Sequence, residues 1–225
     1  MKAGSNSSKS LLCCAPIVGA GVVKAQDQSP GEPIYAGKAL SSWVDEVAAL
    51  SHLRQALNTN WPEVRAVRAI GTNAIPWLLS EMTNQTPSGT GDERPYFHQL
   101  RARAGFWALG ETAAPAIPKL LDLLEQQPEV VPSALGGIGF PGLTALQQCL
   151  TNAPHYVPPY LLKKIPRERA AVSALAALFV AIDAGRIAKS DAAYLLPTIR
   201  VWAKDTNPEA AYWADGVLRE LGEEQ

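Results

Sequence analysis

A short pattern that occurs twice in the chain constrains the fold more than any other feature. Residues 68–79 read RAIGTNAIPWLL and residues 107–121 read WALGETAAPAIPKLL. In both, an apolar stretch ends at a glycine, a short break follows, and an Ile-Pro step leads into a leucine pair. The spacing between Gly71 and Gly110 is 110 − 71 = 39 residues. A period of this length is typical of architectures built from a repeated pair of helices.

Each part of the pattern suits a helix–turn–helix unit. Glycine ends the first helix because it adopts a left-handed conformation without a steric penalty. Proline in the first turn of the next helix removes no hydrogen bond, since its amide would be unsatisfied there anyway. Each unit is too apolar on one side to stand alone, so adjacent pairs must pack together. The residues predicted to pack between units are Leu78, Leu79, Leu109, Ile117, Leu120, Leu121 and Leu146.

Weaker copies of the pattern extend the helical region toward the C-terminus. Residues 137–146 (GIGFPGLTAL) form a third copy. A fourth helix pair is predicted over 167–184 and 191–203. A last helix is predicted over 208–221, because Asn207 suits the N-cap and proline follows it. These elements predict an all-α fold, an α-solenoid of antiparallel helix pairs.

The first 25 residues have the layout of a secretory signal peptide. Lys2 and Lys9 give a positive start, residues 11–23 are apolar, and Ala25 offers a small residue for cleavage. The apolar run is shorter than the ~20 residues that a membrane span needs. We therefore expect residues 1–25 to be removed and the mature protein to be exported, periplasmic or extracellular, with no membrane span.

A linker is predicted between this segment and the helical domain. Residues 26–40 begin with a stretch rich in proline, glycine and polar residues, which is typical of exposed chain. Ser42 is followed three residues later by Asp45, which resembles a capping box. The repeat domain is therefore predicted to span residues 41–225.

The net charge of the chain indicates which classes of partner it can bind. The formal net charge is −1, and loss of three lysines with residues 1–25 leaves 17 basic against 21 acidic residues, or −4. Nucleic-acid binding favours a basic domain, so no nucleic-acid partner is expected.

The mature chain keeps only one cysteine, Cys149, and the Leu146-Cys149-Leu150 spacing predicts that it is a small buried residue. Lipidation at Cys13 or Cys14 is an alternative to cleavage after Ala25, although neither follows the usual small residue.

The segment WALGETAAPAIPKLLDLL (107–124) resembles the HEAT repeat, in its bacterial HEAT-like form. The resemblance is best over residues 61–150. Residues 34–44 are similar to the segment that precedes such repeats in some exported bacterial HEAT proteins. The resemblance implies a non-catalytic protein–protein interaction or scaffold module with another protein as partner. An alternative is an accessory subunit of an enzyme, similar to HEAT-like phycobilin lyase subunits, although no residue here specifies a bilin site.

Motifs for catalysis or cofactor binding are weak in this chain. The glycines of 137–142 match the dinucleotide fingerprint, but that motif needs a preceding strand, and the pattern here predicts a repeat turn. His52, His98 and His155 lack the spacing of zinc ligands. No nucleophile elbow or P-loop occurs. We expect no enzyme activity, no metal and no cofactor.

Four arginines lie on the first helices of two adjacent repeats: Arg65, Arg68, Arg101 and Arg103. Equivalent helices of a solenoid align, so these side chains could form a basic ridge that binds an acidic segment of the partner. The alternative is ordinary pairing within the protein, with Glu63, Glu81 or Glu111.

Two other features leave alternatives open. Six tryptophans are predicted mainly to pack between helices, with one or two exposed as binding anchors. They are Trp43, Trp61, Trp77, Trp107, Trp202 and Trp213. Residues 83–95 are long for a turn between helices, which is consistent with either a functional loop or a tolerated insertion.

Overall fold

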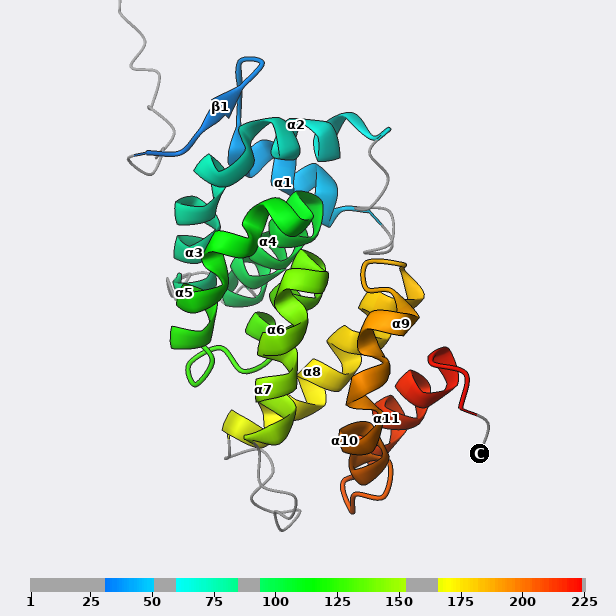
Figure 1. The fold of residues 1–225 in the computed structure, drawn as a ribbon. Helices are drawn as coiled ribbons and strands as arrows, with labels where there is room; N and C mark the ends of the chain where they lie inside the picture. Colours follow the sequence, from blue (N-terminus) through cyan, green and yellow to red (C-terminus); the bar gives the residue numbers. More distant parts are fainter. Residues whose placement is uncertain (1–30, 51–59, 85–93, 153–165, 224–225) are drawn as a thin grey trace, which may run out of the picture.

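The computed structural model describes residues 31–50, 60–84, 94–152 and 166–223. Most of these residues are helical (Figure 1), which confirms the all-α prediction. The predicted signal peptide, including Cys13 and Cys14, lies outside the described residues. Across the described ranges, no helix combines the length and the apolar character that a membrane span requires.

A small hairpin precedes the first helix. Strand β1 (Ile34–Tyr35) pairs antiparallel with β2 (Lys38–Ala39). The turn residues Ala36 (φ 51°) and Gly37 (φ 77°) both have positive φ, as in a type I′ turn. The C-terminal part of the predicted 26–40 linker is therefore structured, while residues 26–30 lie outside the description.

Helix α1 (Leu40–Ala48) begins two residues before the predicted capping box. That prediction was wrong, since Ser42 lies inside the helix and Ala39 occupies the N-cap. The carboxylate of Glu32 instead accepts a hydrogen bond from the backbone N–H of Ser41. A side chain from the preceding segment thus satisfies an amide that the first turn leaves open.

The two clearest copies of the pattern fold as predicted. Helix α2 (Pro62–Ile70) leads through a 3-10 turn, η2 (Gly71–Ala74), into α3 (Ile75–Thr83). Helix α4 (Arg94–Leu109) leads through η3 (Gly110–Ala116) into α5 (Ile117–Asp122).

The glycines that end these helices have positive φ, 63° at Gly71 and 61° at Gly110. The predicted left-handed helical conformation is wrong in one respect, because ψ of Gly71 is −139°. This pair of angles is the mirror image of extended backbone, which is open essentially to glycine alone. Gly139 repeats it, with φ 87° and ψ −139°.

The C-terminal half continues the helical pattern. Its elements are α6 (Val130–Ile138), η4 (Phe140–Gly142), α7 (Leu143–Thr151), α8 (Pro166–Asp183), α9 (Lys189–Ala192), η6 (Ala193–Leu195), α10 (Leu196–Trp202) and α11 (Pro208–Glu220). Helix α11 begins as predicted, because the Asn207 side chain accepts a hydrogen bond from the backbone N–H of Glu209 at 3.0 Å.

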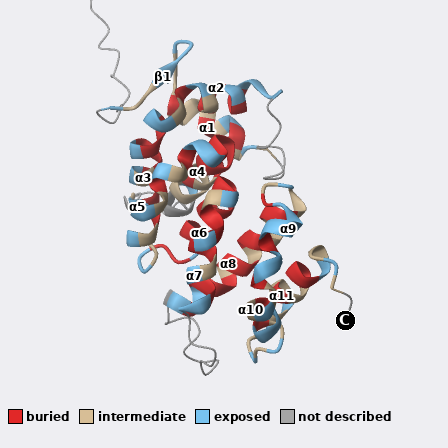
Figure 2. Cartoon of the chain, viewed as in Figure 1, coloured by how far each residue is buried: buried red, intermediate tan, exposed pale blue. Residues whose placement is uncertain are grey.

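Helices α4, α6 and α8 form the centre of the packing. Helix α4 packs against α1, α3 and α6, while α8 packs against α6, α7 and α11 (Figure 1). Buried residues line the facing sides of these helices (Figure 2). The fully buried Trp107 donates a hydrogen bond from Nε1 to the carbonyl of Ser133 at 2.9 Å, which joins α4 to α6.

The predicted packing residues divide into two groups. Leu78, Leu109, Leu120 and Leu146 are buried, as predicted. Leu79, Ile117 and Leu121 are only partly buried, although they pack against the core. In each adjacent leucine pair of α3 and α5, one residue points inward and the other lies toward the surface, since neighbouring positions on a helix face different directions.

Among the tryptophans, Trp77, Trp107 and Trp202 are buried, whereas Trp43 and Trp213 are partly buried. Trp61, at the N-cap of α2, is exposed.

Candidate functional site

Two of the predicted site arginines lie on α2 in different environments. Arg65 is exposed. Arg68 is half-buried, and its Nε donates a hydrogen bond to the carbonyl of Ala108, near the C-terminal end of α4, at 2.8 Å. Burial lowers the pKa of the Arg68 guanidinium. Of these two arginines, Arg65 is thus the more accessible to solvent.

Arg101 is held within the protein by two carboxylates. Its Nε and Nη2 donate to Oδ1 and Oδ2 of Asp45 at 2.5 and 2.6 Å, and its Nη1 lies 3.6 Å from Oε2 of Glu81. Burial lowers the pKa of Arg101, but the hydrogen bonds and charges of Asp45 and Glu81 outweigh it and raise the pKa. His98 Nδ1 also lies 2.7 Å from Glu81 Oε2.

The alternative considered for the arginines, pairing within the protein, therefore holds for Arg101 with Glu81. The side chain of Arg101 extends from α4 about two helical turns before Ala108, whose carbonyl Arg68 binds. The guanidinium groups of Arg101 and Arg68 therefore do not meet. Arg103, two residues after Arg101, is half-buried on α4. The role of Arg65, Arg68, Arg101 and Arg103 in partner binding stays a prediction.

Arg186 was not among the predicted site residues. It follows the turn residue Gly185, and its Nη2 donates to the carbonyl of Trp107, directly before the acceptor that Arg68 uses. The only sequence signal for it was an arginine next to a glycine at the predicted end of a helix.

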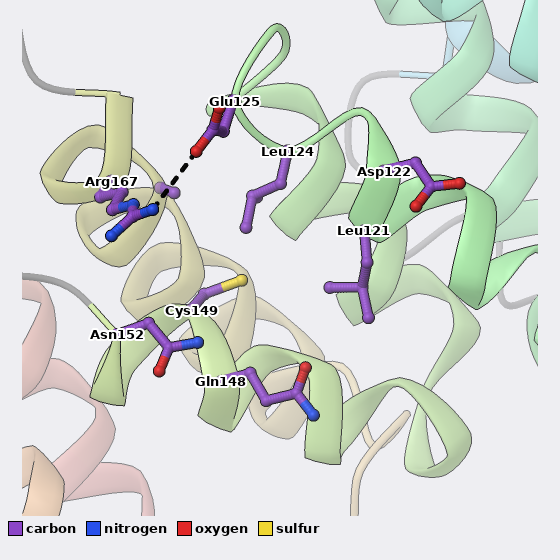
Figure 3. Close-up of a pocket in the computed structure, with 9 residues that line it drawn as sticks. Leu121, Asp122, Leu124, Glu125, Gln148, Cys149, Asn152 and Arg167 are labelled. Atoms are coloured by element: carbon purple, nitrogen blue, oxygen red, sulfur yellow. Dashed lines mark hydrogen bonds and ion pairs between the residues drawn. The ribbon is translucent and has the colours of Figure 1, made fainter.

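A cavity of about 430 Å³ opens between α5, α7 and α8 (Figure 3). Leu121 and Leu124 extend from the α5 side toward Cys149 on α7 (Figure 3). Arg167 of α8 pairs with Glu125 at the rim, with Nη2 3.4 Å from Oε1. The other lining residues are Asp122, Gln148, Asn152 and Ala170. The lining thus combines apolar side chains with polar and charged ones, which suits a ligand that has both kinds of group.

Cys149 is buried as predicted, and its environment disfavours the reactive form. Burial raises the pKa of the Cys149 thiol to about 12. The thiolate, not the thiol, is the nucleophile in cysteine chemistry. The cavity therefore presents Cys149 as an apolar surface at neutral pH.

The remaining predicted motifs have structural explanations or lie outside the description. A Cβ on Gly137 would lie 2.6 Å from Cδ1 of Trp107, so this glycine permits close packing of α6 on α4. Of the fingerprint-like glycines, Gly137 lies within α6, Gly139 follows its last residue and Gly142 lies in η4, so the motif begins in a helix and not after a strand. His52 and His155 lie outside the described residues. Within the described ranges, no group of three or more His, Cys, Asp or Glu could hold a metal ion. Residues 85–93 of the predicted loop are also outside the description.

Comparisons with known proteins identify no relative: no family model, no curated protein and no solved structure matches the chain.

Proposed function

We propose that this protein is a non-catalytic interaction module of the HEAT-repeat type, in which helix pairs stack as an α-solenoid and bind another protein. The observation that carries the proposal is the stacking of equivalent turns. Turn η2 packs against η3, and η3 packs against η4. Repetition of one unit against its neighbour is the defining feature of solenoid proteins, which bind partners along extended surfaces.

An acidic segment of the partner is the ligand class that the exposed arginine on α2 favours. The planar guanidinium fork matches carboxylate geometry. Arg65 is exposed and forms no ion pair within the described part of the chain. Trp61 is exposed four residues earlier and adds the aromatic surface that interface centres favour.

A photo-crosslinking residue at exposed Ala69, expressed in the native host, tests the proposal. We expect one discrete protein adduct, weakened by Arg65→Glu. The matched control is Lys119→Glu, the same charge reversal at an exposed site on α5. If Ala69 gives no adduct beyond that of a crosslinker placed at Lys119, this surface does not bind a partner.

The cavity between α5, α7 and α8 supports a second proposal, an accessory subunit that handles a small molecule for an enzyme, as in phycobilin-lyase-like HEAT proteins. Its volume of about 430 Å³ is within the range of small-ligand pockets. Native mass spectrometry and an absorption spectrum of protein purified from its host test this proposal. A bound compound that is lost in Leu121→Trp, which would fill the cavity, supports it.

We also propose that the protein is exported after cleavage behind Ala25. The support is the charge and apolar pattern of residues 1–25. N-terminal sequencing of native material should begin at Gln26, and a start at Met1 would contradict export by this route.

A further inference from the structure

Two arginines from distant parts of the sequence meet at the C-terminal end of α4. Arg68 Nε donates to the carbonyl of Ala108, and Arg186 Nη2 donates to the carbonyl of Trp107. The acceptors belong to consecutive residues, and the positive charge of Arg68 acts on Arg186, so the two side chains converge on the same helix end. We call these residues the Arg68–Arg186 pair.

The carboxylate of Glu111 acts electrostatically on Arg186, but it forms no ion pair with the Arg68–Arg186 pair. Within the described residues, neither arginine forms an ion pair. Burial and, second, the positive charge of Arg68 lower the pKa of Arg186 to about 10, while the charge of Glu111 raises it. The C-terminus of α4 offers only about half a negative charge. The C-terminal end of α4 therefore keeps a net positive charge, which comes from the two guanidinium groups of Arg68 and Arg186.

Several other arginines of the described chain do form ion pairs, whereas Arg65 is unpaired but exposed to solvent. Arg101 pairs with Asp45, Arg169 with Glu129, and Arg200 with Glu223. In addition, Nε of Arg186 is buried without an acceptor. A buried unpaired donor and two adjacent like charges both lower stability, so fold stability alone does not account for this arrangement.

The surroundings position Arg186 and add apolar surface. Its side chain lies against Gly110 and Gly139, and a Cβ on Gly110 would lie 2.7 Å from Arg186 Nη1. Phe140 follows Gly139 directly and is 57% exposed. Arginine and aromatic side chains are both enriched at the centres of interfaces.

We propose that the Arg68–Arg186 pair binds a carboxylate from an acidic segment of the protein partner, with Phe140 as the adjacent apolar contact. The inference rests on the proposed interaction function and identifies which arginines receive the partner. Two guanidinium groups fixed by backbone acceptors present donors that are already oriented, so binding orders few side chains.

The first experiment uses the full chain, labelled with ¹⁵N, and glutarate as the probe. Saturable shifts of the Nε–H resonances of Arg68 and Arg186 are expected at millimolar glutarate. Arg68→Gln should weaken the response of Arg186 about tenfold. Exposed Arg219 and the Glu223-paired Arg200 are the internal controls.

Three results would overturn the inference. The first is no saturable shift at Arg68 and Arg186. The second is an equal shift at Arg219, which would indicate an effect of ionic strength alone. The third is a response to inorganic phosphate without one to glutarate, which would exclude a carboxylate as the preferred ligand.

The second experiment separates this inference from the proposed function. The adduct formed by the crosslinker at Ala69 should fall about tenfold with Arg68→Gln and should also fall with Phe140→Ala. An adduct unchanged by both would retain the proposed function and overturn the inference. With no adduct in any background, the proposed function at this surface fails, and the glutarate titration decides the inference alone.

Discussion

The guanidinium of Arg186 packs against the backbone of Gly110, so closely that a Cβ at residue 110 would lie 2.7 Å from Nη1. Gly110 also has φ 61°, which side chains rarely adopt. The contact joins the turn after α4 to the segment after α8 and depends on the absence of a side chain.

Gly110→Ala should therefore destabilise the protein through both the backbone and the contact. Gly185→Ala is the matched control, because Gly185 has φ 70° but nothing lies within 4 Å of its added Cβ. The control should lose about 1–2 kcal/mol from the positive φ alone. Gly110→Ala should lose about 1–3 kcal/mol more from overpacking. Urea unfolding of both variants measures the difference, and equal losses would show that the Arg186 contact adjusts freely.

The adjacent leucines of α5 should respond differently to truncation. Leu120 is fully buried, whereas Leu121 is partly exposed at the cavity. Leu120→Ala should cost about 2–5 kcal/mol of unfolding free energy, the range for a fully buried leucine. Leu121→Ala should cost roughly 1 kcal/mol, since it loses less contact. A larger loss at Leu121 in chemical denaturation would mean that the assigned helix face is wrong.

A substitution at Ala36 in the hairpin turn should stabilise the protein. Ala36 has φ 51°, at a position where type I′ turns favour asparagine. Ala36→Asn should raise the unfolding free energy by about 0.5–1 kcal/mol, because it reduces the penalty of the left-handed region. Ala36→Val should lower it, since a branched side chain disfavours positive φ. Thermal unfolding compares the two, and equal melting temperatures would indicate that the hairpin does not contribute to the cooperative unit.

Stability should depend on pH through Glu168, which is 3% exposed in the first turn of α8. Burial raises the pKa of its carboxyl, the hydrogen bond from Asn207 lowers it, and the charge of Asp205 raises it, with a net increase. A raised folded-state pKa gives a stabilising contribution that is complete below the unfolded-state pKa of about 4.3. This contribution is lost as pH rises through the folded-state pKa, where the unfolded state binds fewer protons than the folded state.

Glu168→Gln should therefore be more stable than the wild type at pH 7, and the advantage should shrink toward pH 4. Melting temperatures of both proteins across this range measure it. Exposed Glu209→Gln is the control for general charge effects. An advantage of Glu168→Gln that grew as pH fell would contradict the assigned direction of the pKa shift.

Removal of Arg101 should destabilise the packing of α4 on α1 and α3. Glu81 is buried and would keep only His98 as a partner in Arg101→Gln. The loss should be about 1–3 kcal/mol, the range for leaving a buried polar group poorly satisfied. Asp45→Asn should cost less, because that carboxylate is more exposed. Denaturant unfolding compares the two, and a negligible loss in Arg101→Gln would show that His98 alone satisfies Glu81.

The positions of helices and turns could be predicted from the sequence because they depend on local sterics. Positive φ at Gly71 and Gly110 follows from the lack of a side chain, and the Asn207 cap acts within two residues. Helical period likewise identified Cys149 as buried. Even there, the start of α1 was missed, since the group that satisfies its first turn is Glu32, outside the helix.

Only the tertiary structure decided which distant side chains meet. Asp45 looked like a cap, but it binds Arg101, 56 positions later. Arg186 reaches α4 across 79 positions and joins Arg68 there. Such pairs depend on how whole helices cross, a property that no short stretch encodes. The sequence by itself thus determined the helical units and the breaks between them. The packing of those units determined which leucine of each pair points into the core, and it brought Arg68 and Arg186 to the same helix end, because both depend on contacts between helices.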